Sequence, residues 1–487
     1  MHPILQDIAA LDGIARGELL RRGELSPREL LEATISAATA LNPQLNAISE
    51  TLYDSARAEV SQTPLMASPL AGQPMFIKDL FMPVAGARMQ NGSLLFKDVP
   101  APFDAEFVSR LRRKGLIIAG TSTAPEFGAL FSTESRLSGA TRNPWDTTRT
   151  PGGSSGGAAA LVAARIVPFA HANDGGGSIR VPASCCGLFG LKPTRGRTPI
   201  GPLVGEGWAG MGINHAVSIS VRDSAALLDC VAGDDPGAPY AAPSQHDSFL
   251  KACQRPSRRL RIGLIEHSDR WDSDADCVSA VRSAATLCES LGHQVQVMRF
   301  PVSSTEFYQQ VFTIIGAQTQ NLMNMIARHS GQTAPLDLLE ASTRVILRER
   351  GQVSGAAYAA AVDWIHALGR RFAAIFQDVD ILLSPTLAKA PVKLGELSVG
   401  DDASLDDFIE KSHSFSPITA LFNATGQPAM SVPLHWNAAG LPIGVHFAAP
   451  FGDEASLFSL ASELELASPW AHKQPTLSAC KAQRETA

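Results

Sequence analysis

The chain has 487 residues, of which 45% are hydrophobic and 18% are charged, values typical of a globular protein. Its net charge is −6 and its pI is about 6.1, which excludes a strongly basic surface for nucleic acid or anionic membrane. The first residues lack a charged segment followed by an apolar run, so we expect no signal peptide and a cytoplasmic protein. Seven cysteines without a CxxC pair are expected to be free thiols.

Predicted helices and strands alternate along the chain. Ser26-Pro27-Arg28-Glu29 is a capping box followed by apolar residues at helical spacing, so the N-terminal segment is predicted to be helical. The patterns then predict, in chain order, a helix over 104–114, a strand over 116–119, a helix over 154–165, a strand over 166–172, a strand over 259–266, a helix over 275–291 and a strand over 294–300. Residues 304–375 are predicted to be mostly helical and 378–384 to form a strand. This alternation favours one large α/β layer.

Two Gly/Ser tracts lie close together in the sequence. They are Pro151–Gly157 (PGGSSGG) and Asp174–Arg180 (DGGGSIR), and their inner serines, Ser154 and Ser178, are 24 residues apart. One such tract alone is most often a flexible loop or a helix cap. Two tracts that each adjoin an apolar segment favour chemistry instead. A phosphate-binding loop is disfavoured, because neither tract continues into Gly-Lys-Ser/Thr or fits G-x-G-x-x-G after a strand.

Lys78 lies upstream, inside the apolar run MFIKDLFM over 75–82. Desolvation in such a run favours the neutral amine, which is the form that a general base needs. A carboxylate of Asp79 facing this amine would act in the opposite direction, and the sequence leaves this open. A nucleophilic serine, a second serine that relays the proton, an amine base and Gly-rich backbone facing an oxyanion are what a Ser–Ser–Lys acyl-transfer enzyme needs.

A Ser-His-Asp triad and a metal site are the competing interpretations. His171 is near Ser178 in sequence, but no Gly-x-Ser-x-Gly surrounds Ser178, so His171 is expected to be a hydrogen-bonded strand-end histidine. There is no H-E-x-x-H motif and no Cys/His cluster, so no metal and no cofactor are expected.

The tracts and their surroundings resemble the amidase signature family. The resemblance rests on 152–157 (GGSSGG), 174–183 (DGGGSIRVPA) and 187–196 (GLFGLKPTRG), with further matches at 78–79, 120–127, 143–146 and 423–428. It extends over roughly residues 25 to 465 and is weakest over 230–380. Within the family the chain is most similar to bacterial amidases of the 6-aminohexanoate-cyclic-dimer hydrolase and aryl acylamidase type.

The resemblance implies an α/β fold whose core is a large mixed, twisted β-sheet covered on both faces by helices. We expect a single amidase domain over 1–487. It would comprise an N-terminal helical segment (1–60), a catalytic signature core (70–230), a variable, helix-rich substrate-pocket region (231–390) and a C-terminal part that completes the core (391–487).

The family's functional residues transfer onto matching positions of this sequence. They imply Ser178 as nucleophile, Ser154 as bridging serine on a cis peptide and Lys78 as general base. The implied oxyanion donors are the backbone amides of Gly175, Gly176, Gly177 and Ser178, and the implied supporting residues are Ser155, Asp174 and Arg180. For the substrate pocket we expect Phe127, Ile315, Gly316, Pro385 and Phe447.

The resulting prediction is an amidase that hydrolyses carboxylic amide bonds of a small molecule, linear or cyclic, through a covalent acyl-enzyme. Two alternatives stay open. One is a glutaminase-type amidotransferase A subunit that acts with a partner, and the other is a catalytically silent binding protein on the same fold. The sequence also leaves open the natural amide and whether the chain forms a homodimer.

Overall fold

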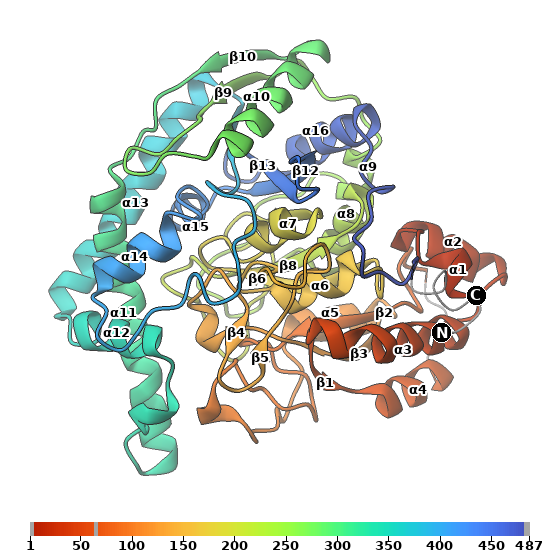
Figure 1. Cartoon of the computed structure of the whole chain (residues 1–487), viewed down its shortest axis with the longest axis horizontal. Helices are drawn as coiled ribbons and strands as arrows, with labels where there is room; N and C mark the ends of the chain where they lie inside the picture. The colour runs from red at the N-terminus through yellow and green to blue at the C-terminus, as the bar shows by residue number, and fades with distance from the viewer. Residues whose placement is uncertain (1–3, 63–66, 482–487) are drawn as a thin grey trace.

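An eight-stranded mixed β-sheet forms the centre of the molecule (Figure 1). The structure is a computed structural model that describes residues 4–62 and 67–481, so the extreme ends of the two predicted terminal segments lie outside the described residues. The strands of the sheet are β6 (Phe169–Asp174), β7 (Phe189–Lys192), β8 (Ile213–Ser218), β9 (Arg261–Leu264), β10 (Gln294–Val297), β11 (Ile381–Pro385), β12 (Ala429–Trp436) and β13 (Pro442–Ala448). Their order is β10-β9-β11-β13-β12-β7-β8-β6. The pairs β10–β9 and β9–β11 are parallel, and the other neighbouring pairs are antiparallel.

A second, three-stranded sheet carries the predicted base. Its strands are β1 (Ile48–Thr51), β2 (Pro74–Lys78) and β3 (Ile117–Ser122), in the order β1-β3-β2. Every residue of β2 is buried, which follows from its apolar sequence. Lys78 is the last residue of β2 and pairs with Ser122 of the parallel strand β3. A short hairpin of β4 (Glu134–Ser135) and β5 (Gly139–Ala140) lies further along the chain.

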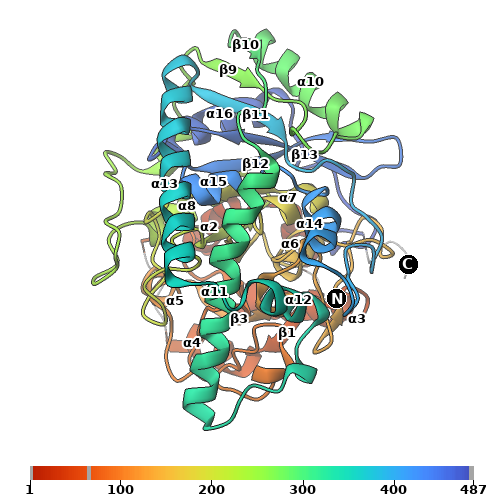
Figure 2. The ribbon, with the colours of Figure 1, turned by 90° about the vertical axis from the view of Figure 1, so that its left-hand side faces the viewer.

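The helices surround these sheets. They are α1 (Leu5–Ile8), α2 (Gly13–Arg22), α3 (Pro27–Leu45), α4 (Tyr53–Gln62), α5 (Glu106–Arg113), α6 (Gly156–Ala163), α7 (Arg180–Cys186), α8 (Val221–Val231), α9 (Phe249–Ala252), α10 (Ala275–Ser290), α11 (Ser304–Ser330), α12 (Ala341–Arg350), α13 (Gly355–Asp378), α14 (Leu405–His413), α15 (Leu421–Thr425) and α16 (Glu454–Ala467), with 3₁₀ turns η1 (Leu94–Phe96), η2 (Glu126–Gly128) and η3 (Leu336–Leu338). Figure 2 shows the long helices α11 and α13 running side by side along one flank of the molecule.

Helices cover both faces of the large sheet, as the resemblance implies. Helices α8, α10 and α16 share one hydrophobic core with Leu383 and Phe447. Helices α11, α13 and α15 share another with Leu382 and Ala448. Neighbouring strand residues point to opposite faces, so these pairs show that β11 and β13 are buried on both sides. The predicted α/β fold with a helix-covered mixed sheet is confirmed.

Local sequence signals placed several elements correctly. The capping box forms at the start of α3, where Ser26 Oγ accepts from the Glu29 amide at 3.2 Å and Glu29 accepts from the Ser26 amide at 2.8 Å. Two boundaries near the Gly/Ser tracts differ from the prediction. Helix α6 begins at Gly156 rather than 154, and β6 spans 169–174 rather than 166–172. The later start of α6 leaves Ser154 and Ser155 in the turn before the helix. The later end of β6 brings Asn173 and Asp174 into the strand.

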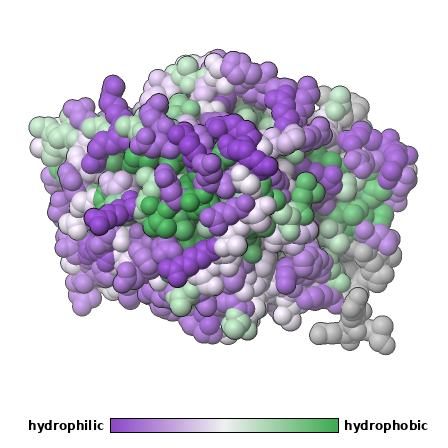
Figure 3. All heavy atoms as spheres, turned by 90° about the horizontal axis from the view of Figure 1, so that it is seen from above, coloured by the Kyte–Doolittle hydropathy of each residue, from purple (hydrophilic) through white to green (hydrophobic). Residues whose placement is uncertain are grey.

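Two further expectations concern the thiols and the membrane. All seven cysteines are free, and five of them are buried. No helix within 4–62 and 67–481 is long and apolar enough to cross a bilayer. Seen from above, hydrophilic side chains dominate the surface, and hydrophobic ones gather in the hollows between them (Figure 3).

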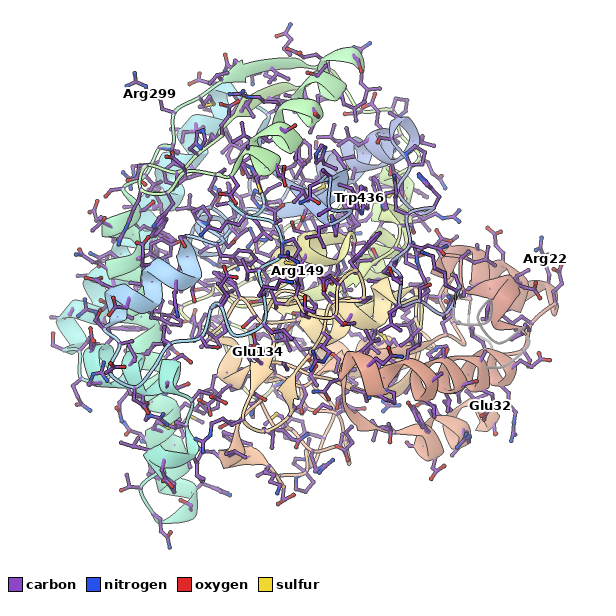
Figure 4. The ribbon with its side chains drawn as sticks, in the orientation of Figure 1. Arg22, Glu32, Glu134, Arg149, Arg299 and Trp436 are labelled. Carbon is purple, nitrogen blue, oxygen red and sulfur yellow. The ribbon has the colours of Figure 1, made fainter. Side chains whose placement is uncertain are left out.

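The C-terminal part closes over the signature core. Arg149 donates to the carbonyl oxygen of Pro391 at 2.6 Å, and the Gly395 amide donates to Glu134 Oε2 at 2.9 Å (Figure 4). These contacts join segments more than 200 residues apart in sequence. They hold residues 391–395 against the hairpin and loop that precede the first Gly/Ser tract.

Candidate active site

Lys78 and Ser154 meet inside the protein. The Lys78 side chain is fully buried at the end of β2, and its Nζ lies 2.7 Å from Ser154 Oγ. A second contact joins Nζ to Asn173 Oδ1 at 2.6 Å. The Lys78 backbone N–H donates to His171 Nδ1 at 3.1 Å, which ties β2 to β6. Two residues that the sequence separates by 76 positions therefore form one hydrogen-bonded pair.

The surroundings of Lys78 favour its neutral form. Burial lowers the pKa of Lys78 well below the usual lysine value, and the charge of Asp174 acts in the opposite direction without cancelling that effect. Asp79 does not face the amine. Its carboxylate accepts from Ser49 Oγ at 2.6 Å and from the Gln90 amide at 2.7 Å. The side chain of Asp79 is thus engaged elsewhere, which answers the question that the sequence left open.

The first Gly/Ser tract forms the turn that presents Ser154. The Gly153–Ser154 peptide bond is cis. A Cβ on Gly153 would lie 2.5 Å from the carbonyl oxygen of Ser132 and 2.6 Å from that of Leu130, so only glycine fits there. Ser155 Oγ donates to the carbonyl oxygen of Asn173 at 3.2 Å. The tract is therefore fixed both to the preceding loop and to β6.

The second tract forms a tight turn between β6 and α7, with Asp174 at its centre. Asp174 Oδ1 accepts from the Gly177 amide at 2.7 Å, and Oδ2 accepts from the Ile179 amide at 3.1 Å. Gly177 has a φ of 142°, a conformation that favours glycine. Ser178 follows it and is 5% exposed.

The hydrogen bond from Gly177 bears on the predicted oxyanion site. Its amide already donates to a carboxylate, so Gly177 is poorly suited to bind an oxyanion. Gly175, Gly176 and Ser178 have no such hydrogen bond to Asp174. The oxyanion prediction is therefore narrowed to the amides of these three residues.

Arg180 fixes the turn of the second tract through all of its N–H donors. Its guanidinium pairs with Asp174 through Nε at 3.0 Å and Nη2 at 2.9 Å. The other N–H groups reach the Thr419 carbonyl oxygen at 2.8 Å, Asn423 Oδ1 at 2.6 Å and His446 Nε2 at 3.1 Å. These contacts use the five N–H donors of an arginine. Arg180 can only donate, so His446 Nε2 must be the acceptor of this contact. The proton of the neutral His446 ring is therefore on Nδ1, which lies 3.2 Å from Ser384 Oγ.

The Asp174–Arg180 pair stays charged despite full burial. Burial opposes ionisation of Asp174, but the guanidinium of Arg180 and hydrogen bonds from Arg180 and Asn423 hold its pKa well below its usual range. Asn423 Nδ2 also donates to Asp174 Oδ1 at 2.9 Å and to the Met211 carbonyl oxygen at 3.0 Å. The turn is thereby fixed by charge-assisted hydrogen bonds from Arg180, six residues further along the chain, and from Asn423, 249 residues away.

The histidine alternative receives no support from the geometry. His171 is fully buried inside β6 rather than at a strand end, and its Nδ1 accepts from the Lys78 backbone N–H. Burial lowers its pKa to about 3. In the part of the chain that the structure describes, the ring makes no hydrogen bond to Ser154 or Ser178.

Comparison with known proteins identifies the family. A family model described as Amidase matches residues 29–458 of the chain. The chain belongs to the amidase signature family. The 6-aminohexanoate-cyclic-dimer hydrolase of Paenarthrobacter ureafaciens is 36% identical over 479 residues, which cover 96% of each sequence.

Solved structures agree with this assignment. The 6-aminohexanoate cyclic dimer hydrolase complexed with substrate superposes with a TM-score of 0.92 at 36% identity, covering 96% of this amidase and 99% of that chain. A bacterial aryl acylamidase of the amidase signature enzymes superposes with a TM-score of 0.87 at 25% identity, covering 97% of this amidase and 99% of that chain. The chain is thus an amidase, a hydrolase of amide bonds, and the predicted family and enzyme class are confirmed.

The residues predicted for the substrate pocket of the amidase are not all in one place. Phe127 adjoins the site, because a Cβ on its neighbour Gly128 would lie 3.1 Å from Ser154 Oγ. Pro385 ends β11, one residue after the Ser384 that faces His446. Ile315 is partly buried in the core beside α13.

Two of the pocket predictions do not fit the structure. Gly316 faces α12, since a Cβ there would lie 2.3 Å from Arg350 Cβ. Phe447 is fully buried in the core under α10 and α16, on the face of β13 opposite His446. Neither residue faces the turn that carries Ser178, because both belong to packing contacts between elements.

Sequence reasoning missed four residues that hold the site together. They are Asn173, Thr419, Asn423 and His446. Asn173 directly precedes the matched 174–183 stretch, and Asn423 begins the matched 423–428 stretch. The family resemblance therefore marked both positions but assigned neither a role in the site. Thr419 Oγ1 donates to the Gly176 carbonyl oxygen at 2.7 Å. Nothing local in the sequence marks Thr419 or His446, because their partners lie more than 240 residues away.

Proposed function

We propose that this amidase hydrolyses carboxylic amides through Ser178, Ser154 and Lys78, with a covalent acyl-enzyme intermediate. The observation that carries the proposal is the buried Lys78 amine, 2.7 Å from Ser154 Oγ and with a pKa lowered by burial. A neutral amine that is hydrogen-bonded to a serine hydroxyl can accept the proton of that hydroxyl.

The acylation step follows from these roles. Lys78 accepts the proton of Ser154 while Ser154 accepts the proton of Ser178, and Ser178 Oγ bonds to the carbonyl carbon. The amides of Gly175, Gly176 and Ser178 stabilise the negative charge on the carbonyl oxygen, a type of contact worth about 10²–10³ in rate per donor. When the C–N bond breaks, the leaving amine takes a proton from Ser154, and Lys78 returns its proton to Ser154.

Deacylation repeats the same proton path. Water gives a proton to Ser154, which passes one to Lys78, and the hydroxide adds to the ester carbon. The ester C–O bond then breaks, the proton returns to Ser178 and the carboxylic acid leaves. The cycle consumes one water and needs no other co-reactant.

The relatives suggest a substrate class. The named relative is a 6-aminohexanoate-cyclic-dimer hydrolase, and another structural neighbour is an aryl acylamidase. We infer that the chain takes small cyclic or linear amides with aliphatic segments. A screen of cyclic, linear aliphatic and aryl amides, read by mass spectrometry, tests this class. Robust turnover by the isolated chain would also argue against an amidotransferase subunit that needs a partner.

The nucleophile has a direct test. Ser178→Ala should abolish amide turnover and keep the folded structure, and a fluorophosphonate should label Ser178 in the parent protein. A label that maps to another serine would overturn the assignment.

The predicted single domain and cytoplasmic location, like the homodimer, remain predictions.

The base has a separate test in the pH profile. If Lys78 acts as neutral amine, activity rises with pH until the amine is deprotonated and then levels off. Lys78→Ala should remove this acid limb and most of the rate, and Lys78→Arg should not rescue, because arginine stays charged. An acid limb that survives Lys78→Ala but disappears in His171→Gln would show that histidine is the base.

A further inference from the structure

Asn173 is a neutral amide in direct contact with the lysine. Its Oδ1 lies 2.6 Å from Lys78 Nζ, and its Nδ2 donates to the Leu80 carbonyl oxygen at 2.9 Å. These two contacts fix which end of the amide faces the amine. A rotated amide would place Nδ2 against Nζ, two donors facing each other, and Oδ1 against a carbonyl oxygen.

The donors and acceptors around Nζ then determine the direction of its lone pair. A neutral amine carries two N–H donors and one lone pair. Asn173 Oδ1 can only accept, so the short contact must use an N–H of Lys78. The Asn173 main-chain oxygen, 3.5 Å from Nζ, is a further acceptor, and Ser154 Oγ, 2.7 Å away, can donate its proton into the lone pair.

We propose that Asn173 is the positioning residue of the base, because its Oδ1 binds one N–H of Lys78 and turns the lone pair toward Ser154 without adding charge. The inference rests on the proposed role of Lys78 as base. The fold supports such a role, because Asn173 is built into β6 and its main-chain oxygen accepts from Ser155 Oγ at 3.2 Å. Strand β6 thus holds both the amine and the turn of the bridging serine.

The charged and titratable groups near the Lys78 amine are engaged by other partners. From β6, Asp174 is engaged by Arg180, and His171 is buried with its Nδ1 on the Lys78 backbone N–H. From the end of β2, Asp79 faces Ser49 and Gln90. From the first tract, Ser154 and Ser155 contribute hydroxyl groups, and from β3 the paired residue is Ser122.

Asn173→Asp is the first test. It places a carboxylate where the neutral oxygen lies, which favours the ammonium form of Lys78 and raises its pKa. An opposite charge at this distance shifts a pKa by about 1–3 units. The acid limb of kcat/KM should therefore move upward by about 1–3 pH units, with activity recovering at alkaline pH.

Asn173→Ala is the second test and has the opposite sign. Without the Oδ1 acceptor the ammonium form loses a hydrogen bond, so the acid limb should move to lower pH. The plateau should also fall, by up to about 10²-fold, because the lone pair is no longer aimed. Structural damage alone would not give shifts of opposite sign in the two variants.

Asn143→Asp is the matched control. Asn143 is also a fully buried amide whose Nδ2 donates to carbonyl oxygens, at 3.1 Å to Thr150 and 2.9 Å to Cys185. Its contacts do not include Lys78. This variant should lower the unfolding midpoint and leave the acid limb in place.

The profiles are measured both on an amide substrate and as the rate of fluorophosphonate labelling of Ser178, with far-UV circular dichroism as the check on folding. Opposite shifts in Asn173→Asp and Asn173→Ala support the inference. If both Asn173 variants fold and their acid limbs do not shift, while Lys78→Ala removes the limb, the role of Asn173 is overturned and the proposed function still stands. If Lys78→Ala keeps the limb, the proposed function itself fails. If Asn173→Asp does not fold, the downward shift in Asn173→Ala decides.

Discussion

Replacing Arg180 by methionine should destabilise the amidase strongly, because its guanidinium is fully buried and satisfies several groups at once. The variant removes the partner of the Asp174 carboxylate, and Asn423 Oδ1 and His446 Nε2 lose their donor as well. Breaking a buried ion pair by removing one partner lowers the free energy of unfolding by about 3–5 kcal/mol. Arg180→Lys keeps the charge but has three donors in place of five, so we expect an intermediate loss of about 1–3 kcal/mol.

The assay is equilibrium urea unfolding, followed by tryptophan fluorescence and by circular dichroism so that coincident transitions can be verified. Arg113→Met is the matched control, because its side chain is 59% exposed and pairs with Glu106 at the surface. That change should stay within about 0.5 kcal/mol of the parent. If Arg180→Met lost no more stability than Arg113→Met, the network under the glycine turn would not hold the site as argued.

The remaining predictions test the turn, its carboxylate and the absence of a metal. Gly175→Ala should lower amide turnover, because a Cβ there would lie 2.8 Å from Trp208, and Gly175→Ala combined with Trp208→Ala should recover part of it. Asp174 has a folded pKa below its unfolded value of about 3.9, so its stabilisation is complete above that pH and is lost as pH falls toward the folded pKa. The stability difference between the parent and Asp174→Asn, measured by urea unfolding, should therefore shrink between pH 5 and pH 2. Dialysis against a chelator should leave the rate unchanged, since the described residues contain no cluster of three metal-ligating side chains, and a loss restored by added zinc would contradict this.

The sequence predicts this fold well where the signal is local. The capping box at Ser26 depends on residues three apart, and apolar periodicity gives the long helices between 304 and 375. The start of α6 was missed, because Gly and Ser tolerate both helix and turn and only the neighbouring loop decides. The order of strands across the sheet could not be read locally, since β6 and β7 are separated by β8 although they are adjacent in the chain.

The same distinction applies to the site. Lys78, Ser154 and Ser178 are predicted as site residues because they lie in an apolar run and in two Gly/Ser tracts, whereas Asn423 contacts Asp174 across 249 residues. Phe447, predicted for the pocket, lies instead in the core under α10 and α16 for a related reason. An apolar residue on a strand buried on both faces gives no sign of which face it lines, so the facing helices decide.

The proposed role of Lys78 as base is supported by the hydrogen bonds that engage the nearby carboxylates with other partners. Asp174 is the charge that acts to keep Lys78 protonated, yet its two oxygens accept from the Arg180 guanidinium and from backbone amides. Asp79, next in sequence, is turned toward Ser49 and Gln90. What faces the amine is instead the neutral oxygen of Asn173. Desolvation is therefore not offset by a free counter-ion, and the arrangement favours the neutral form of the amine beside the Ser154 hydroxyl.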